Sequence, residues 1–271
     1  MRAARWPRLV LPLALAAALA FAVKATSPHG GLVDTVLTPR VLQYVGALSK
    51  LVFLFLSAVF AWSIGGRFEP GNPVRPAWRL LGLGGVTFFL GQVSFAPYQL
   101  VKNEDPPYPS IADVFFMLAY PLFVAALFAF IRAYRVAGYA IGTPAARLAT
   151  AAVVVAVCAL AGYAILRPVL RAPATPLAQV LNVAYPVLDF LLLIPTVLLI
   201  RIAVALRGGA AWKIWAALLA GFVFLCLGDI AFAYLSALGH EALDPVIHAL
   251  YVLAYGLMAR GVLHQHELLA S

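Results

Sequence analysis

Two ionisable side chains lie inside stretches of sequence that are otherwise strongly apolar. Asp189 belongs to the run VLNVAYPVLDFLLL of residues 180–193, and Lys50 belongs to the similar run VLQYVGALSKLVFL of residues 41–54. The two runs align without a gap, and Asp189 then matches Lys50. A charged side chain in the middle of a membrane costs about 2.5–3.5 kcal/mol on insertion scales, so it needs a partner, water or a function. We therefore predict that Lys50 and Asp189 meet as an ion pair.

The similarity between the two halves of the chain continues beyond these runs. The segment LGQVSF of residues 90–95 matches LGDIAF of residues 227–232, which aligns Gln92 with Asp229. Leu118-Ala119-Tyr120 likewise matches Leu253-Ala254-Tyr255, and Asp113 then aligns with His248. We predict two parallel three-helix repeats, related by a pseudo-twofold axis along the membrane normal. Such an axis places matched residues at the same depth.

These repeats define the expected organisation of a single transmembrane domain over residues 1–271. Residues 1–40 would hold the first span and an outer loop, and residues 132–178 would hold a connecting span. The repeat units would cover residues 41–131 and 179–265. The first span is either a cleavable signal peptide or a retained anchor, and we predict retention because it gives the later loops a consistent charge assignment.

The composition indicates a polytopic membrane protein. Of the 271 residues, 64% are hydrophobic and only 11% are charged, and the mean hydropathy is +0.97. A soluble core cannot bury this much apolar surface. Runs of about 20 apolar residues, the length that crosses a bilayer, recur along the chain. We predict an all-α polytopic membrane helix bundle of eight spans near residues 9–24, 41–64, 80–100, 111–131, 148–167, 179–200, 214–236 and 246–263.

The distribution of charge predicts the topology. The net charge of +9 comes from Lys and Arg in short loops rather than from a basic patch, so we expect no nucleic-acid partner. Most basic residues, from Arg2 and Arg5 onward, fall in segments that would face the cytoplasm if both termini are cytoplasmic. Acidic residues such as Asp34 and Glu241 fall on the other side.

The polar residues of the spans are expected to converge in the outer half of the bilayer. They would form an outward-facing pocket for a small ligand or a proton, unless the ion pair simply fastens two helices together. No catalytic residue, metal ligand or cofactor is expected, since Cys158 and Cys226 both lie inside spans without metal-ligand spacing. The candidate ligand-binding residues are Lys50, Gln92, Asp113, Tyr120, Asn182, Tyr185, Asp189, Asp229, His248 and Tyr251.

Short motifs also suggest a family. Pro109, Ser110, Ala112 and Asp113 form a Pro-Ser-x-Ala-Asp motif that Tyr120-Pro121 follows, and a later segment has Ala184-Tyr185-Pro186, Asp189 and then Gly228-Asp229. Over residues 40–263 the chain resembles the multi-span sensor region that precedes the output domain in many bacterial diguanylate cyclases (GGDEF proteins) and sensor histidine kinases. The resemblance implies a sensory module of the bacterial cytoplasmic (inner) membrane. Because we expect no output domain after the last span, the module would stand alone or act through a separate signalling partner protein.

Three functions from different classes remain open at this point. The leading one is a sensor-like or ligand-binding membrane module that is not an enzyme. The second is a small proton-coupled transporter, because repeats around charges at the midplane are a common transporter plan. The third is an intramembrane lipid hydrolase in which Asp189 and Asp229 activate water.

Overall fold

The computed structural model describes residues 6–27, 31–102, 104, 106–139, 142–240 and 243–270. Arg2, Arg5 and Glu241, which contributed to the predicted topology, lie outside the described residues. The part of the chain that is described consists of helices and their connections and contains no strand.

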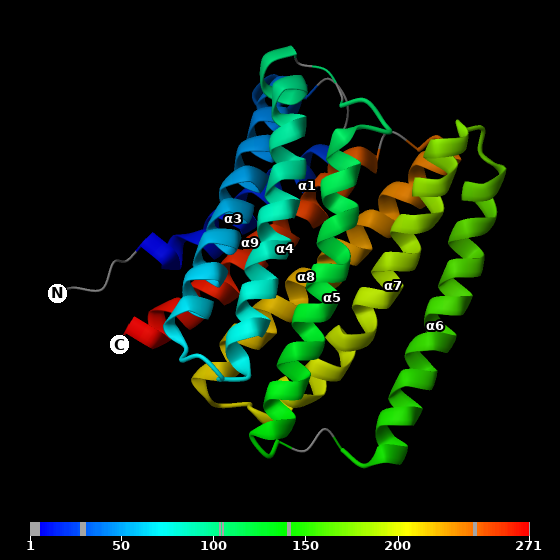
Figure 1. Cartoon of the computed structure of the whole chain (residues 1–271). Coiled ribbons are helices and arrows are strands. Elements are labelled where there is room, and N and C mark those ends of the chain that lie inside the picture. Colours follow the sequence, from blue (N-terminus) through cyan, green and yellow to red (C-terminus); the bar gives the residue numbers. More distant parts are fainter. Residues whose placement is uncertain are drawn as a thin grey trace.

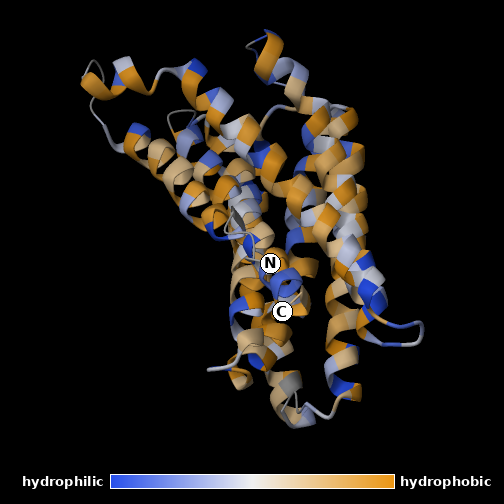
Figure 2. Cartoon of the chain, turned by 90° about the vertical axis from the view of Figure 1, so that its left-hand side faces the viewer, coloured by the Kyte–Doolittle hydropathy of each residue, from blue (hydrophilic) through white to orange (hydrophobic). Residues whose placement is uncertain are grey.

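Eight helices are long and apolar enough to cross a membrane in the described part of the chain, which confirms the predicted all-α polytopic bundle. They are α1 (Val10–Thr26), α3 (Pro39–Arg67), α4 (Val74–Ala96), α5 (Ile111–Val136), α6 (Pro144–Arg171), α7 (Pro176–Ala205), α8 (Ala210–Leu238) and α9 (Asp244–Ala270). Three short segments complete the described structure: η1 (Trp6–Leu9), α2 (Leu32–Val36) and η2 (Pro97–Lys102). In Figure 2 hydrophobic residues cover most of the length of the helices.

Most helices extend a few residues beyond the predicted spans, and capping residues explain the early start of three of them. In each of three helices a threonine side chain accepts a hydrogen bond from the backbone three residues on, and a proline follows it at the first helical position. The threonine satisfies one of the free N–H groups of the first turn, and the proline has the backbone angle that a helix needs. The caps are Thr38-Pro39 of α3, Thr143-Pro144 of α6 and Thr175-Pro176 of α7.

The helices form a ring of two similar halves. Helices α3, α4 and α5 pack side by side, as do α7, α8 and α9, and the halves meet where α3 packs on α9 and α5 packs on α7. In Figure 1 both α3 and α7 run from the upper to the lower end of the bundle, so the halves point the same way. We call the α3–α9 and α5–α7 contacts the two seams of the ring. A twofold rotation that takes α3 to α7 and α5 to α9 superimposes each seam on the other, as the repeats predict. Helices α1 and α6 lie outside the ring, α1 on α3 and α9 and α6 on α7 and α8.

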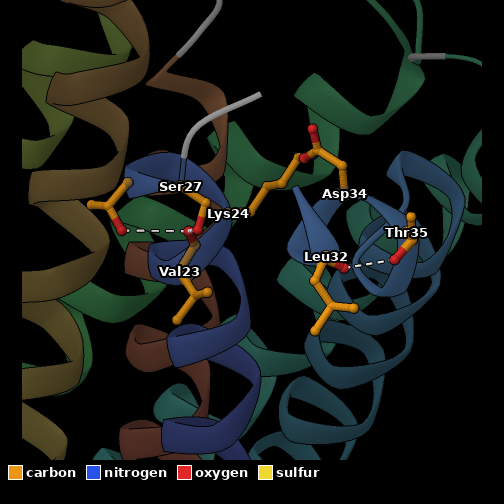
Figure 3. Close-up of polar contacts among 7 residues, drawn as sticks. Val23, Lys24, Ser27, Leu32, Asp34 and Thr35 are labelled. Carbon is orange, nitrogen blue, oxygen red and sulfur yellow. Dashed lines mark hydrogen bonds and ion pairs between the residues drawn. The ribbon is translucent and has the colours of Figure 1, made fainter. Parts of the chain in front are cut away.

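A short helix closes the connection between α1 and α3. Lys24 near the end of α1 forms an ion pair with Asp34 of α2, as Figure 3 shows. The hydroxyl of Ser27 donates to the Val23 carbonyl at 2.6 Å and the hydroxyl of Thr35 donates to the Leu32 carbonyl at 2.7 Å, which satisfies carbonyl groups at the ends of both helices. These contacts lie at the end of the bundle that is uppermost in Figure 1, called the upper end below.

Small residues let α8 and α9 approach closely. A Cβ atom on Gly221 would lie 2.6 Å from the Met258 side chain and 2.9 Å from the Ala254 backbone oxygen. The backbone oxygen has no freedom to move aside. Glycine at this position is therefore required by helix packing, as is common between membrane helices.

We predict that Gly221→Ala destabilises the protein by about 1–3 kcal/mol, the usual cost of overpacking. The matched control is Gly66→Ala, because Gly66 of α3 has open space where a Cβ atom would be added. Thermal unfolding of both variants in the same detergent measures the difference. Equal melting temperatures for the two variants would contradict the close α8–α9 contact.

Candidate functional site

Four side chains on four helices form a hydrogen-bonded cluster inside the ring. The Tyr120 hydroxyl of α5 lies 2.8 Å from Asp189 Oδ1 of α7 and also contacts Asp229 Oδ2 of α8. The Tyr251 hydroxyl of α9 donates to Asp229 Oδ1 at 2.5 Å. Asp189 and Tyr120 are both 0% exposed. We call Tyr120, Asp189, Asp229 and Tyr251 the acid cluster.

Local sequence explains how α9 reaches this cluster. Gly228, which precedes Asp229, has no side chain where the Tyr251 ring passes, and a Cβ atom there would lie 2.9 Å from that ring. The ring also stacks on Tyr255 one helical turn later, with 6.1 Å between centroids. The Gly-Asp pair therefore places a carboxyl group and room for its tyrosine partner side by side.

One hydroxyl group of the acid cluster faces two carboxyl groups. A phenol hydroxyl has one proton and can donate to one acceptor at a time. Tyr120 Oη nevertheless lies within hydrogen-bonding distance of one carboxyl oxygen of Asp189 and one of Asp229. The hydroxyl can therefore satisfy only one of these oxygens fully at a time. Two acids placed this close together favour a proton shared between them.

One atom of the cluster has no protein partner. Asp189 Oδ2 is buried and lacks a hydrogen bond among the described residues. The backbone carbonyl of the same residue accepts a weak contact from Cys226 Sγ at 3.7 Å. A buried carboxyl oxygen without a donor destabilises the folded protein. A proton, a water molecule or a cationic group bound at Asp189 Oδ2 would remove this cost.

A second pair of contacts joins α5 to α7 nearer the upper end. The Tyr185 hydroxyl of α7 donates to Asp113 Oδ1 of α5 at 2.8 Å. The other carboxyl oxygen of Asp113 accepts from the Ser110 backbone N–H at 2.6 Å, in a capping box that starts α5. The Pro-Ser-x-Ala-Asp motif is thus a helix start whose acid also reaches the neighbouring helix.

Tyr108 extends these contacts into the loop before α5. Its hydroxyl donates to Asn182 Oδ1 of α7 at 2.6 Å. Burial, and next the nearby charge of Asp113, raise the pKa of Tyr108, which keeps its hydroxyl protonated as a donor. Sequence reasoning did not select Tyr108, although it lies in the PPYPS segment directly before the motif.

The predicted ion pair between Lys50 and Asp189 does not form. Lys50 lies on α3, which packs on α1, α4 and α9, whereas Asp189 lies on α7, which packs on α5, α6 and α8. No ion pair among the described residues includes either side chain, and Lys50 is not among the groups that interact with the Asp189 carboxyl. The twofold relation places matched residues at equal depth but on opposite sides of the axis. The expectation that equal depth would bring them together was therefore wrong.

The ten candidate residues consequently divide into two groups. Asp113, Tyr120, Asn182, Tyr185, Asp189, Asp229 and Tyr251 lie in hydrogen-bonded contacts where α5, α7, α8 and α9 meet. Lys50, Gln92 and His248 have no hydrogen bond to them, and the Gln92 Nε2 and His248 Nδ1 atoms are buried without partners among the described residues.

The candidate residues lie away from the two hollows that are described at the ends of the bundle. Two open hollows lie at the ends of the bundle: one of about 410 Å³ beside Arg167 and Arg171, and one of about 610 Å³ beside Arg75 and Arg132. None of the candidate residues lines either hollow. The acid cluster is instead packed among aromatic rings, with Phe88 of α4 against both Tyr120 and Tyr255.

Comparison with known proteins adds no assignment. No protein-family model, curated protein or solved structure matches this chain. The resemblance to sensor regions therefore stays a prediction. Among the described residues, no three His, Cys, Asp or Glu side chains are grouped so that they could hold a metal ion.

We predict that Tyr120→Phe destabilises the bundle by about 1–3 kcal/mol, because it removes the only hydrogen bond to the Asp189 carboxyl among the described residues. The control is Tyr163→Phe on α6, where the side chain is exposed and the change removes the same hydroxyl. Thermal unfolding measures both. A Tyr120→Phe variant as stable as Tyr163→Phe would mean that the bridging hydroxyl contributes nothing.

Proposed function

We propose that this protein is a sensor-like membrane module that binds a proton or a small cation at the acid cluster. The supporting observation is the single Tyr120 hydroxyl that bridges Asp189 and Asp229, because two neighbouring acids with one donor between them favour a shared proton. Besides the shared proton, the cluster would bind one further proton or a small cation at the free Asp189 Oδ2 atom. This ligand would neutralise the remaining negative charge.

The location of the cluster supports a signalling role. Tyr120 belongs to the first repeat unit, whereas Asp189, Asp229 and Tyr251 belong to the second. Binding at the cluster therefore changes the hydrogen bonds across the seam between α5 and α7. If the seam has one set of hydrogen bonds with the ligand and another without it, the ligand shifts the equilibrium between these two conformations.

The orientation in the membrane is part of the same proposal. We place the upper end outside and both termini in the cytoplasm of a bacterial cell, because of the basic residues at the opposite end. A proton or small cation would then enter from the outer side, and a separate signalling partner protein would contact the lower end.

A proton-coupled transporter is the second candidate function. The observation in its favour is that the acid cluster lies where two parallel repeat units meet, as substrate and ion sites often do in transporters. Uptake into proteoliposomes that depends on a pH gradient would support this function. No corresponding observation favours a lipid hydrolase, because Asp189 is fully buried between helices rather than facing lipid.

We predict that infrared spectra of the wild-type protein at neutral pH contain the C=O band of a buried carboxylic acid. Asp229→Asn should shift or remove this band, because it removes one of the two acids that share the proton. Glu69→Gln, which changes an exposed acid at the end of α3, should leave the band in place. A wild-type spectrum without a protonated carboxyl group would refute the shared proton.

The signalling role makes a separate prediction about the seam. Lowering the pH, or adding a small organic cation such as guanidinium, should change hydrogen–deuterium exchange along α5 and α7 in wild type and in Glu69→Gln. Asp229→Asn should not show this change. If the exchange profile of Asp229→Asn responds as wild type does, the cluster is a structural contact and the sensor proposal fails.

A further inference from the structure

The second seam of the ring, between α3 and α9, carries the opposite chemistry from the acid cluster. Where α7 has Asp189, the matched residue of α3 is Lys50, and where α5 has Asp113, the matched residue of α9 is His248. Lys50 is only 5% exposed, and it is close enough to His248 for the two groups to interact electrostatically. Both basic groups therefore share one buried region, and we call it the basic seam.

Comparison of the two seams shows what the basic seam lacks. At the seam between α5 and α7, the Tyr185 hydroxyl donates a hydrogen bond to Asp113 Oδ1. The residue of α3 that matches Tyr185 is Gly46, and the ring of Phe21 from α1 fills the space where its side chain would begin, 2.9 Å from a built Cβ atom. Phe21 packs against His248 with 5.4 Å between ring centroids. Phenylalanine has no hydroxyl, so His248 Nδ1 is buried without the partner that its counterpart Asp113 has.

Two buried polar atoms on this side of the ring, Gln92 Nε2 and His248 Nδ1, have no hydrogen-bond partner among the described residues. Lys50 is 5% exposed and belongs to no ion pair among the described residues. Gln92 matches Asp229, so the twofold relation places it relative to Lys50 as Asp229 is placed relative to Asp189. His248 Nδ1 can carry a proton and donate in the same way. Burying these donors is costly unless an acceptor joins them.

The acid cluster does not supply that acceptor. Lys50 is not among the groups that interact with the Asp189 or the Asp229 carboxyl. Helix α1, which covers the basic seam, contributes only apolar side chains to its buried face, and Phe21 is 2% exposed. Lys50 lies eleven residues into α3, about 16 Å along the helix axis, which is too deep for a lipid headgroup to be the acceptor.

We propose that the basic seam is a binding site for a small monovalent anion, such as chloride or formate, held by Lys50 and His248 and covered by α1. A compact anion is the expected ligand because Lys50 is buried and Phe21 packs against His248. Lys50 supplies the charge, and the His248 and Gln92 nitrogen atoms supply further hydrogen bonds. The proposal does not depend on the function assigned to the acid cluster.

The first experiment uses the wild-type full chain in nanodiscs. Chloride replaces gluconate at constant ionic strength while the unfolding temperature is measured. We expect a saturable rise in that temperature with chloride and also with formate, because an anion that binds only the folded protein stabilises it. If chloride, formate and gluconate give the same unfolding temperature over the whole titration, the folded protein binds none of these anions preferentially and the proposal is overturned.

The second experiment locates the site. Lys50→Met should weaken chloride binding by at least about tenfold, the loss expected for one charge-assisted hydrogen bond. Lys213→Met, which removes an exposed lysine from the start of α8, is the matched control and should bind chloride as wild type does. His248→Phe keeps a ring beside Phe21 but loses the nitrogen atoms, and it gives the same measurement if Lys50→Met does not fold. A chloride effect that survives both Lys50→Met and His248→Phe would place the anion elsewhere and overturn the assignment.

A third variant separates the two proposals. Asp229→Asn alters the acid cluster alone, so it should lose the proton response and keep the chloride response. Loss of the chloride response in Asp229→Asn but not in Lys50→Met would show that the anion acts at the acid cluster. That result would also overturn the assignment of the anion to the basic seam.

Discussion

A fully buried carboxyl group inside a membrane bundle is the constraint on which this structure depends. Asp189 is 0% exposed, and its only side-chain hydrogen bond among the described residues comes from Tyr120 on a neighbouring helix. Such a group persists only where other groups compensate its burial. Tyr120 and Asp229 provide this compensation, and Tyr251 in turn supports Asp229. The acid cluster thus ties together four of the six helices of the ring.

The two repeat units have kept their packing while their polar chemistry has diverged. Helices α3 and α9 meet as α5 and α7 do, yet one seam contains Lys50 and His248 and the other contains Asp113 and Asp189. Helix α1 packs on α3 and α9 and covers the basic seam. Helix α6 packs on α7 and α8, which is not the position that the twofold rotation gives for α1. The helices outside the ring therefore make the two seams unequal even where the repeats agree.

Much of the fold could be predicted because its physical causes are local. Apolar runs of membrane-spanning length predict helices wherever they occur, and the eight predicted spans correspond to the eight helices. The structure also shows the repeat in the common direction of α3 and α7 (Figure 1). The Thr-Pro caps were present in the sequence as signals for earlier helix starts, but hydropathy alone does not reveal them.

By itself, the sequence determined which residues are buried at membrane depth and which residues of the two halves are equivalent, because hydropathy and internal repetition are properties of the chain alone. Only the tertiary structure decided which of those residues meet. Depth along a helix does not specify the angle around the bundle, so the sequence could not show that Asp189 meets Tyr120 and Asp229 while Lys50 lies near His248. That choice follows from the packing of α3 on α9 and of α5 on α7, which contacts between distant segments establish.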